Sequence, residues 1–153
     1  MYATAVVFMR PRWRRAVARG TRVVYLFMPE TATERTWWIV VSVLAGIGEE
    51  ITWRGVQTTL LVTLTGSYWT AALVSAISFA LAHFLQGWKT SVLIVLFALG
   101  FQGLAWLAGS LYVAMLVHVA YDITAGFSYG HFARELGYRV EESPARSIAP
   151  SGA

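Results

Sequence analysis

Cysteine is absent from the 153-residue chain, which excludes disulfides, thiolate metal sites and a cysteine nucleophile. Charge is scarce as well: 13% of the residues are charged and 57% are hydrophobic, whereas roughly a quarter of the residues in soluble domains are charged. Between Gly55 and Tyr121 the only Asp, Glu, Lys or Arg is Lys89. A water-soluble fold would have to cover several helices with uncharged surface, so the composition favours a membrane protein.

The signatures of several hydrolase classes are also missing. A zinc protease of the His-Glu-x-x-His type is excluded because the chain lacks that motif. An intramembrane serine protease of the rhomboid type would need Gly-x-Ser-Gly, and Ser110, in "AGSLY", instead has the setting of a helix N-cap. An intramembrane aspartyl protease would need two aspartates, and Asp122 is the only one in the apolar region.

Hydrophobic runs separated by short turns occupy most of the chain from Trp37 onward. We expect a first membrane helix that starts near Trp37, followed by a short helical stretch. Gly46 and Gly48 leave open whether one kinked helix or two helices form there. The predicted fold class is all-α: a polytopic transmembrane helical bundle with about four spans plus a short extra helix. The three later spans are expected at Ser67 to Leu85, Thr90 to Ala108 and Ser110 to Tyr129.

Positive charge is concentrated before the first span. Arginines between Arg10 and Arg22 supply most of the net charge of +4, and the positive-inside rule places such residues in the cytosol. We interpret this cluster as a topology signal near anionic lipid and not as a nucleic-acid site. The predicted organisation is a cytosolic basic segment (1–35), a membrane-embedded core (36–130) and a polar, disordered tail (131–153). Both ends of this multi-pass cell-membrane protein would then lie in the cytoplasm.

Ionisable residues also stand at membrane depth, where they are costly and usually functional. The six residues are Glu49, Glu50, Arg54, His83, His118 and Asp122. Counting about 1.5 Å per residue along each span puts them at similar depths, so they could line one cavity. Residues four apart share a helical face, so Glu50 can pair with Arg54, and His118 with Asp122.

Glu49 is left without a partner on its own helix. A buried carboxylate without a cation binds protons more tightly, and a neighbouring histidine can hold it in the charged form. We therefore expect Glu49 and His83, which has the Phe79 ring beside it, to deprotonate a water molecule. His118 and Asp122 would face the oxygen that gains negative charge during hydrolysis. The structural alternative is that these residues form only helix–helix hydrogen bonds and a salt bridge.

Three motifs, in order, resemble those of a known family. The CPBP family of membrane proteases, which includes the type II CAAX prenyl endopeptidases and the bacterial Abi proteins, carries Glu-Glu-x-x-x-Arg, Phe-x-x-x-His and His-x-x-x-Asn/Asp. These motifs are matched here by "EEITWRG", "FALAHF" and "HVAYD". The resemblance covers about residues 37–127 and implies glutamate-dependent, metal-free proteolysis inside the membrane, with Glu50 and Arg54 as a supporting ion pair.

The resemblance also implies a role for each remaining residue. By position, Glu49 resembles the catalytic glutamate, and His83 resembles the histidine that acts with it on the water. His118 and Asp122 occupy the places of the oxyanion-stabilising pair, although the prenyl endopeptidases carry asparagine at the second place. We expect the substrates to be peptides or small membrane-associated proteins.

Two further kinds of function stay open at the level of sequence. The oxygen and nitrogen ligands Glu49, Glu50, His83, His118 and Asp122 also suit a metal-dependent membrane hydrolase. Buried Glu and His residues serve as proton relays in carriers, and a non-catalytic scaffold would need only the fold. For the protease we expect the lipid bilayer as a partner, no cofactor, no metal and no nucleic acid. The sequence does not predict the oligomeric state.

Overall fold

The computed structural model describes residues 28–135. Every element in this range is a helix and no strand is present there, which confirms the all-α prediction. The predicted basic cluster between Arg10 and Arg22, and residues 136–153 of the predicted tail, lie outside the described residues. The elements in chain order are α4 (Ala32–Glu49), the π-helix η1 (Glu50–Gln57), α5 (Thr58–Thr65), α6 (Tyr68–Ala82), the short 3-10 helix η2 (Phe84–Gln86), α7 (Trp88–Ala108) and α8 (Leu111–Glu135).

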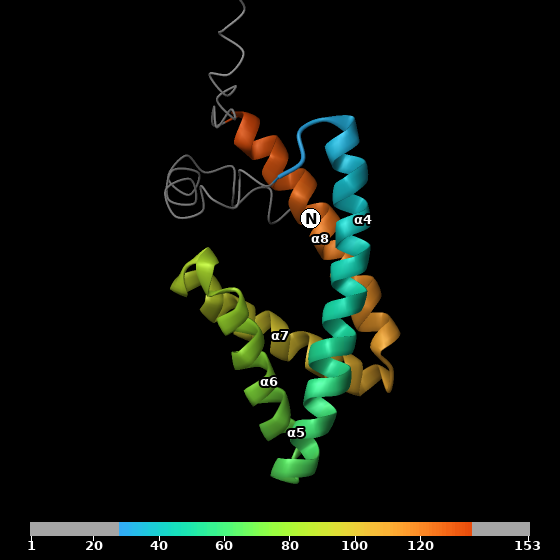
Figure 1. The fold of residues 1–153 in the computed structure, drawn as a ribbon, viewed down its shortest axis with the longest axis vertical. Coiled ribbons are helices and arrows are strands. Elements are labelled where there is room, and N and C mark those ends of the chain that lie inside the picture. Colours follow the sequence, from blue (N-terminus) through green and yellow to red (C-terminus); the bar gives the residue numbers. More distant parts are fainter. Residues whose placement is uncertain (1–27, 136–153) are drawn as a thin grey trace, which may run out of the picture.

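Three elements, α4, η1 and α5, follow one another without a break and form the long helical column of Figure 1. α8 packs along α4, and α6 packs along α5. α7 contacts both α6 and α8, and so connects the helices that lie against the two ends of the column. In the middle of the column, η1 contacts α6 and α8. The fold therefore brings two other helices to the segment that carries Glu50 and Arg54.

The first helix begins earlier than predicted, at Ala32 instead of near Trp37. Thr31 is its N-cap, and its hydroxyl accepts a hydrogen bond from the backbone N–H of Glu34 at 3.2 Å. Glu34 Oε2 in turn accepts from the backbone N–H groups of Thr31 and Glu30, which completes a capping box. Donation by these two N–H groups lowers the pKa of the exposed Glu34 carboxyl below its usual range. The capping box sets the helix start one turn ahead of the apolar run.

The glycines of α4 do not divide the column into two helices. A Cβ on Gly46 would lie 2.7 Å from Val119 Cγ2 and 2.9 Å from the Val119 backbone nitrogen. Glycine at this position therefore allows α8 to approach α4 closely. The column ends at Gly66, whose left-handed φ of 67° is typical of a helix C-cap. Ser67 then caps α6 by accepting a hydrogen bond from the Thr70 backbone N–H.

The later helices differ from the predicted spans at their ends. α6 stops at Ala82, short of the predicted Leu85, because His83 leaves the helical conformation (φ −99°, ψ 10°) and the turn η2 follows. The turn closes at Gly87, which has a positive φ of 96°. Before α8, the Ser110 hydroxyl accepts from a backbone N–H two residues on, as expected for an N-cap. α8 itself continues to Glu135, five residues into the predicted tail.

Two of the described helices are long and apolar enough to cross a membrane. The most apolar window of α7 has a mean hydropathy of 2.0, and that of Leu111–His131 in α8 has 1.3. α6 is apolar but has 15 residues, fewer than the roughly 20 that a straight span needs. The described residues thus supply two candidate membrane spans, and the total of four stays a prediction.

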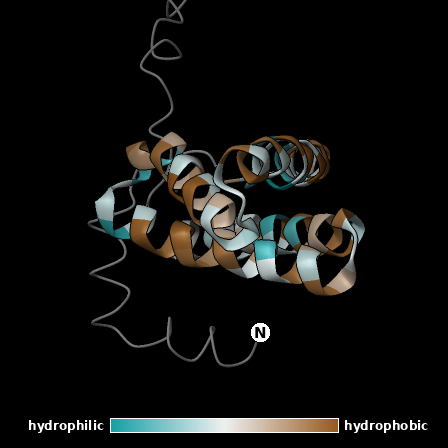
Figure 2. Cartoon of the chain, turned by 90° about the horizontal axis from the view of Figure 1, so that it is seen from below, coloured by the Kyte–Doolittle hydropathy of each residue, from teal (hydrophilic) through white to brown (hydrophobic). Residues whose placement is uncertain are grey.

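Small and polar side chains fill the interior, while large hydrophobic side chains face outward. Leu85, Leu64 and Leu107 are 96%, 81% and 77% exposed, and hydrophobic colour runs along every helix in Figure 2. The buried hydrophobic residues are mostly alanines: Ala71, Ala72, Ala76, Ala80, Ala98, Ala105 and Ala114. The buried polar residues are Ser42, Glu50, Arg54, Thr58, Ser75, Ser91, Gln102 and His118. This distribution is typical of a helical protein whose solvent is lipid.

Candidate active site

The π-helix η1 carries Glu50 and Arg54, and both side chains are buried. A π-helix is a wide turn closed by i→i+5 hydrogen bonds, and such turns are frequent at functional sites. Two hydroxyl groups support it by donating to the Trp53 carbonyl oxygen: that of Thr58 at 2.7 Å and that of Ser75, from α6, at 2.9 Å. These bonds anchor to α6 the wide turn from which Glu50 and Arg54 project.

Glu50 is the centre of the buried part of the site. Its Oε1 lies 3.3 Å from Arg54 NH1, so the predicted ion pair is present. The same oxygen accepts a hydrogen bond from His118 Nδ1 at 2.8 Å, which links η1 to α8. The bond between Glu50 and His118 was not predictable from spacing, because the two residues are 68 positions apart. The i,i+4 spacing predicts contacts within one helix, such as Glu50 with Arg54 and His118 with Asp122, and says nothing about contacts between helices.

His118 also faces the two carboxylates that are less buried. Its Nε2 lies 3.7 Å from Glu49 Oε2 and 3.7 Å from Asp122 Oδ2. Three carboxylates, one each from α4, η1 and α8, therefore surround one imidazole. Because Nδ1 hydrogen-bonds to the Glu50 carboxylate, Nδ1 must carry a proton and Nε2 is the nitrogen that faces the open side of the site.

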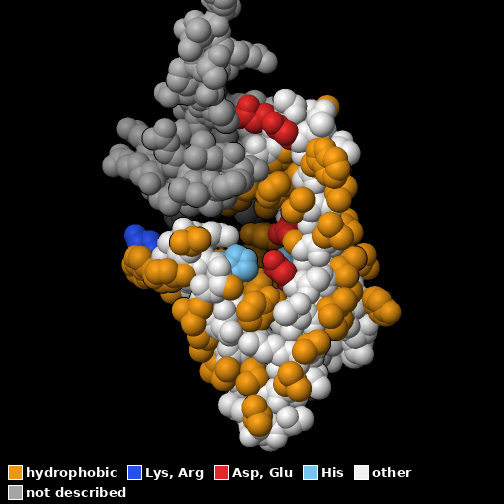
Figure 3. Space-filling view, viewed as in Figure 1, with side chains coloured by type: hydrophobic (Ala, Val, Ile, Leu, Met, Phe, Trp, Pro, Cys, Tyr) orange, Lys and Arg blue, Asp and Glu red, His pale blue; other side chains and the backbone are white. Residues whose placement is uncertain are grey.

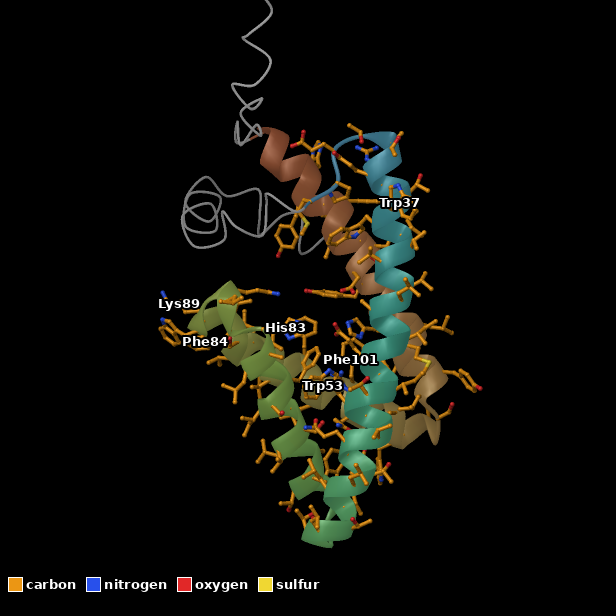
Figure 4. All side chains as sticks on the ribbon, viewed as in Figure 1. Trp37, Trp53, His83, Phe84, Lys89 and Phe101 are labelled. Atoms are coloured by element: carbon orange, nitrogen blue, oxygen red, sulfur yellow. The ribbon has the colours of Figure 1, made fainter. Side chains whose placement is uncertain are left out.

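His83 approaches the same region from the end of α6. Its Nδ1 donates a hydrogen bond to the Phe79 carbonyl oxygen at 2.9 Å, and its ring lies 4.5 Å from the Phe79 ring, as the spacing predicted. In Figure 4 the side chain of His83 points from α6 toward the helical column. His83 is not within ion-pair distance of Glu49, and His118 is the imidazole that lies beside Glu49.

Exposure divides the site into an accessible layer and a buried layer. The side chains of Glu49 and Asp122 are 31% and 27% exposed, whereas those of Glu50 and Arg54 are 0% and 1% exposed. Figure 3 shows acidic side chains and a histidine close together on one face, beside a hollow. Glu49 and Asp122 are therefore accessible to a substrate or water, while Glu50 and Arg54 lie in the interior behind His118.

Two features of the site lie outside the six predicted residues. The Trp38 indole N–H donates to the Asp122 carbonyl oxygen at 2.9 Å, which connects α4 to α8 next to the Asp122 side chain. The aromatic ring of Phe101, from α7, stacks on His118. Residues 28–135 contain no group of three or more His, Asp or Glu side chains with an arrangement that could hold a metal ion.

Comparison with known proteins identifies a family. The model of the family described as "Type II CAAX prenyl endopeptidase Rce1-like" matches residues 31–124, which is more than half of the chain and includes all six ionisable site residues. The match agrees with the resemblance found in the three motifs. A search of curated proteins and a search of solved structures each found no significant match. The chain therefore belongs to the type II CAAX prenyl endopeptidase Rce1-like family.

Proposed function

We propose that the chain is an intramembrane endopeptidase that hydrolyses peptide bonds of peptides or small membrane-associated proteins with water activated by Glu49 and a histidine. The convergence of Glu49, Glu50 and Asp122 on the His118 imidazole is the observation that carries the proposal. Membership of an endopeptidase-like family supports the reaction class. Accessible carboxylates backed by a buried ion pair are also the elements of an acid–base site.

Glu49 is the general base in this reaction. Its carboxylate takes one proton from a water molecule while the water oxygen bonds to the carbonyl carbon of the substrate. His83 assists Glu49 at the water: since its Nδ1–H is bound to the Phe79 carbonyl oxygen, the neutral ring presents Nε2 as an acceptor. The step produces a tetrahedral intermediate with a negatively charged oxygen.

His118 stabilises that oxygen in its doubly protonated form. Nδ1–H is bound to Glu50, and Nε2–H is the donor to the oxyanion. The Asp122 carboxylate lies 3.7 Å from His118 Nε2, so it is turned toward the imidazole, which reduces its repulsion of the oxyanion. The intermediate collapses when the C–N bond breaks, and protonated Glu49 returns its proton to the leaving amine.

Glu50 and Arg54 support the reaction without contacting the substrate. The Glu50 carboxylate accepts from His118 and neutralises Arg54 through the same oxygen. A carboxylate behind an imidazole fixes its orientation and stabilises its positive charge, as in the Ser-His-Asp triad. The wide turn of η1 allows one carboxylate to face the substrate and the next to face the interior.

The reaction takes place at membrane depth in this proposal. The two candidate spans α7 and α8 and the apolar outer surface of the other described helices support a multi-pass arrangement. Both chain ends would lie in the cytoplasm, as the arginine cluster predicts. Water would reach Glu49 through the hollow next to the site.

Cleavage of a peptide library by the purified full chain in detergent tests the proposal. Wild type, Glu49→Ala and His83→Ala would be compared by mass spectrometry, with and without a chelator, and His131→Ala would serve as the matched histidine control. We expect Glu49→Ala to lower kcat by about 100-fold or more, because a positioned general base contributes roughly 10²–10⁴-fold. His83→Ala should cause a smaller loss, and His131→Ala none.

Equal cleavage by wild type, Glu49→Ala and His83→Ala would reject the mechanism. Loss of cleavage in chelator, restored by one divalent ion, would instead assign the activity to a metal-dependent hydrolase.

A further inference from the structure

The two histidines of the site are connected by a continuous series of planar groups. The His83 and Phe79 ring centroids are 4.5 Å apart, and Arg54 Cζ lies 4.7 Å from the Phe79 centroid. Arg54 Cζ also lies 5.5 Å from the Phe101 centroid, and the Phe101 and His118 centroids are 5.1 Å apart. The order is His83, Phe79, Arg54, Phe101, His118, and its members come from α6, η1, α7 and α8.

The two phenylalanine rings help to stabilise the buried positive charge of Arg54, which few other groups compensate. Its side chain is 1% exposed, and neither NH1 nor NH2 has a hydrogen-bond partner among the described residues. The Glu50 carboxylate at 3.3 Å supplies the counter-charge. The negative faces of Phe79 and Phe101 supply the remaining favourable electrostatic contact, since a guanidinium over an aromatic ring is attracted to its quadrupole.

Phe101 also packs against the His118 ring. The two rings are nearly parallel, with an interplanar angle of 25°. A stacked neighbour restricts rotation of the imidazole about χ2, a torsion that otherwise takes a broad range of values. With the plane fixed, Nδ1 points to Glu50 and Nε2 points to Glu49 and Asp122.

We propose that Phe101 is a positioning residue. Its ring packs against the Arg54 guanidinium and fixes the plane of the His118 imidazole. The kinetic part of this inference rests on the proposed peptidase function; the geometric part does not. Phe101 is outside the three sequence motifs and is 8% exposed, so it acts through His118 and not on the substrate.

Two substitutions at Phe101 distinguish the effect of its planar ring from the effect of its volume. Phe101→Met keeps a large apolar side chain without a planar face, and Phe101→Tyr keeps the face. The control is Phe97→Met: Phe97 lies one turn away on α7, is 48% exposed and has its ring beside Tyr121. We expect Phe101→Met to lower kcat about 10-fold or more at unchanged KM, since misplacing a reacting group by about 1 Å can cost roughly 100-fold. Phe101→Tyr should restore most of the rate, and Phe97→Met should match wild type.

Histidine-labelled NMR of the full chain in detergent tests the stack without any assay of activity. The chain has three histidines, so each ring signal can be assigned by single substitution. A ring lying on the face of Phe101 has its protons shifted upfield by the aromatic ring current. The His118 signals should lose this shift in Phe101→Met and keep it in Phe101→Tyr and Phe97→Met.

Wild-type His118 shifts in Phe101→Met would overturn the stacking, whatever the protein catalyses. A lost shift with unchanged kcat would overturn the positioning role, as would equal losses of rate in Phe101→Met and Phe101→Tyr. If the wild type cleaves no peptide while the shift behaves as expected, the proposed function fails and the stack stands.

Discussion

At the scale of single residues, Asp122 is where the chain departs from the prenyl endopeptidases that it resembles, which carry asparagine there. We expect Asp122→Asn to keep most of the wild-type kcat/KM, because the amide retains the contact with His118 and can donate to an oxyanion. Asp122→Ala should lower kcat by about 100-fold, because it removes the contact that orients the His118 donor toward the oxyanion. Steady-state rates on one cleaved peptide are the measurement.

An Asp122→Asn variant as slow as Asp122→Ala would show that the negative charge of Asp122 is required. In that case Asp122 would act through its negative charge, and the expected equivalence with the asparagine of the prenyl endopeptidases would be wrong.

The same Glu→Gln substitution should reduce mainly stability at Glu50 and mainly activity at Glu49. Glu50→Gln leaves the buried Arg54 guanidinium without its carboxylate, and we expect it to lower the free energy of unfolding by about 3–5 kcal/mol, as breaking a buried ion pair does. Glu49→Gln removes a side chain that is 31% exposed, with His118 Nε2 at 3.7 Å. It should lower kcat and change stability little. Thermal unfolding in detergent and peptide cleavage measure the two effects.

Each variant is the control for the other, since the chemical change is identical and the positions are consecutive. Equal stability of the two variants, or equal loss of activity without unfolding, would contradict the division into a reacting carboxylate and a buried supporting carboxylate.

At the scale of elements, the contact between α4 and α8 sets the position of the site. Gly126 of α8 lies directly against the indole of Trp38, and a Cβ there would overlap the ring. We expect Gly126→Ala to cost about 1–3 kcal/mol by overpacking and to weaken the hydrogen bond from Trp38 to the Asp122 carbonyl. Gly100→Ala, on α7, is the control because nothing lies within 4 Å of its added Cβ. Unfolding midpoints that fall equally for both variants would contradict this account.

Element boundaries were only partly predictable from sequence. Apolar runs located every described α-helix, but the start of α4 is set by the Thr31 capping box and not by the first tryptophan. The π-helix was not predicted, because "EITWRGVQ" contains nothing that local propensity distinguishes from an α-helix. Its wide turn is supported by the Ser75 hydroxyl, which belongs to another helix. Such tertiary causes cannot be read from a local pattern.

At the scale of the whole molecule, the composition predicted the all-α class. The similar depths of the six ionisable residues predicted that several of their side chains would lie close together. The pairs within one helix, Glu50 with Arg54 and His118 with Asp122, followed from spacing. The bond from Glu50 to His118 did not, because it depends on how α8 is rotated against η1. For the same reason the position of His118 beside Glu49 was not predicted from the sequence.

The central claim is that Glu49, as the general base, and His118, as the donor to the oxyanion, belong to one catalytic site. A double-mutant cycle with Glu49→Gln, His118→Gln and the double variant, measured as kcat on one peptide, tests it most directly. Residues that act as a unit show strongly non-additive losses. We predict that the double variant is about as slow as the slower single variant. Losses that multiply, or a Glu49→Gln variant with wild-type kcat, would contradict the claim.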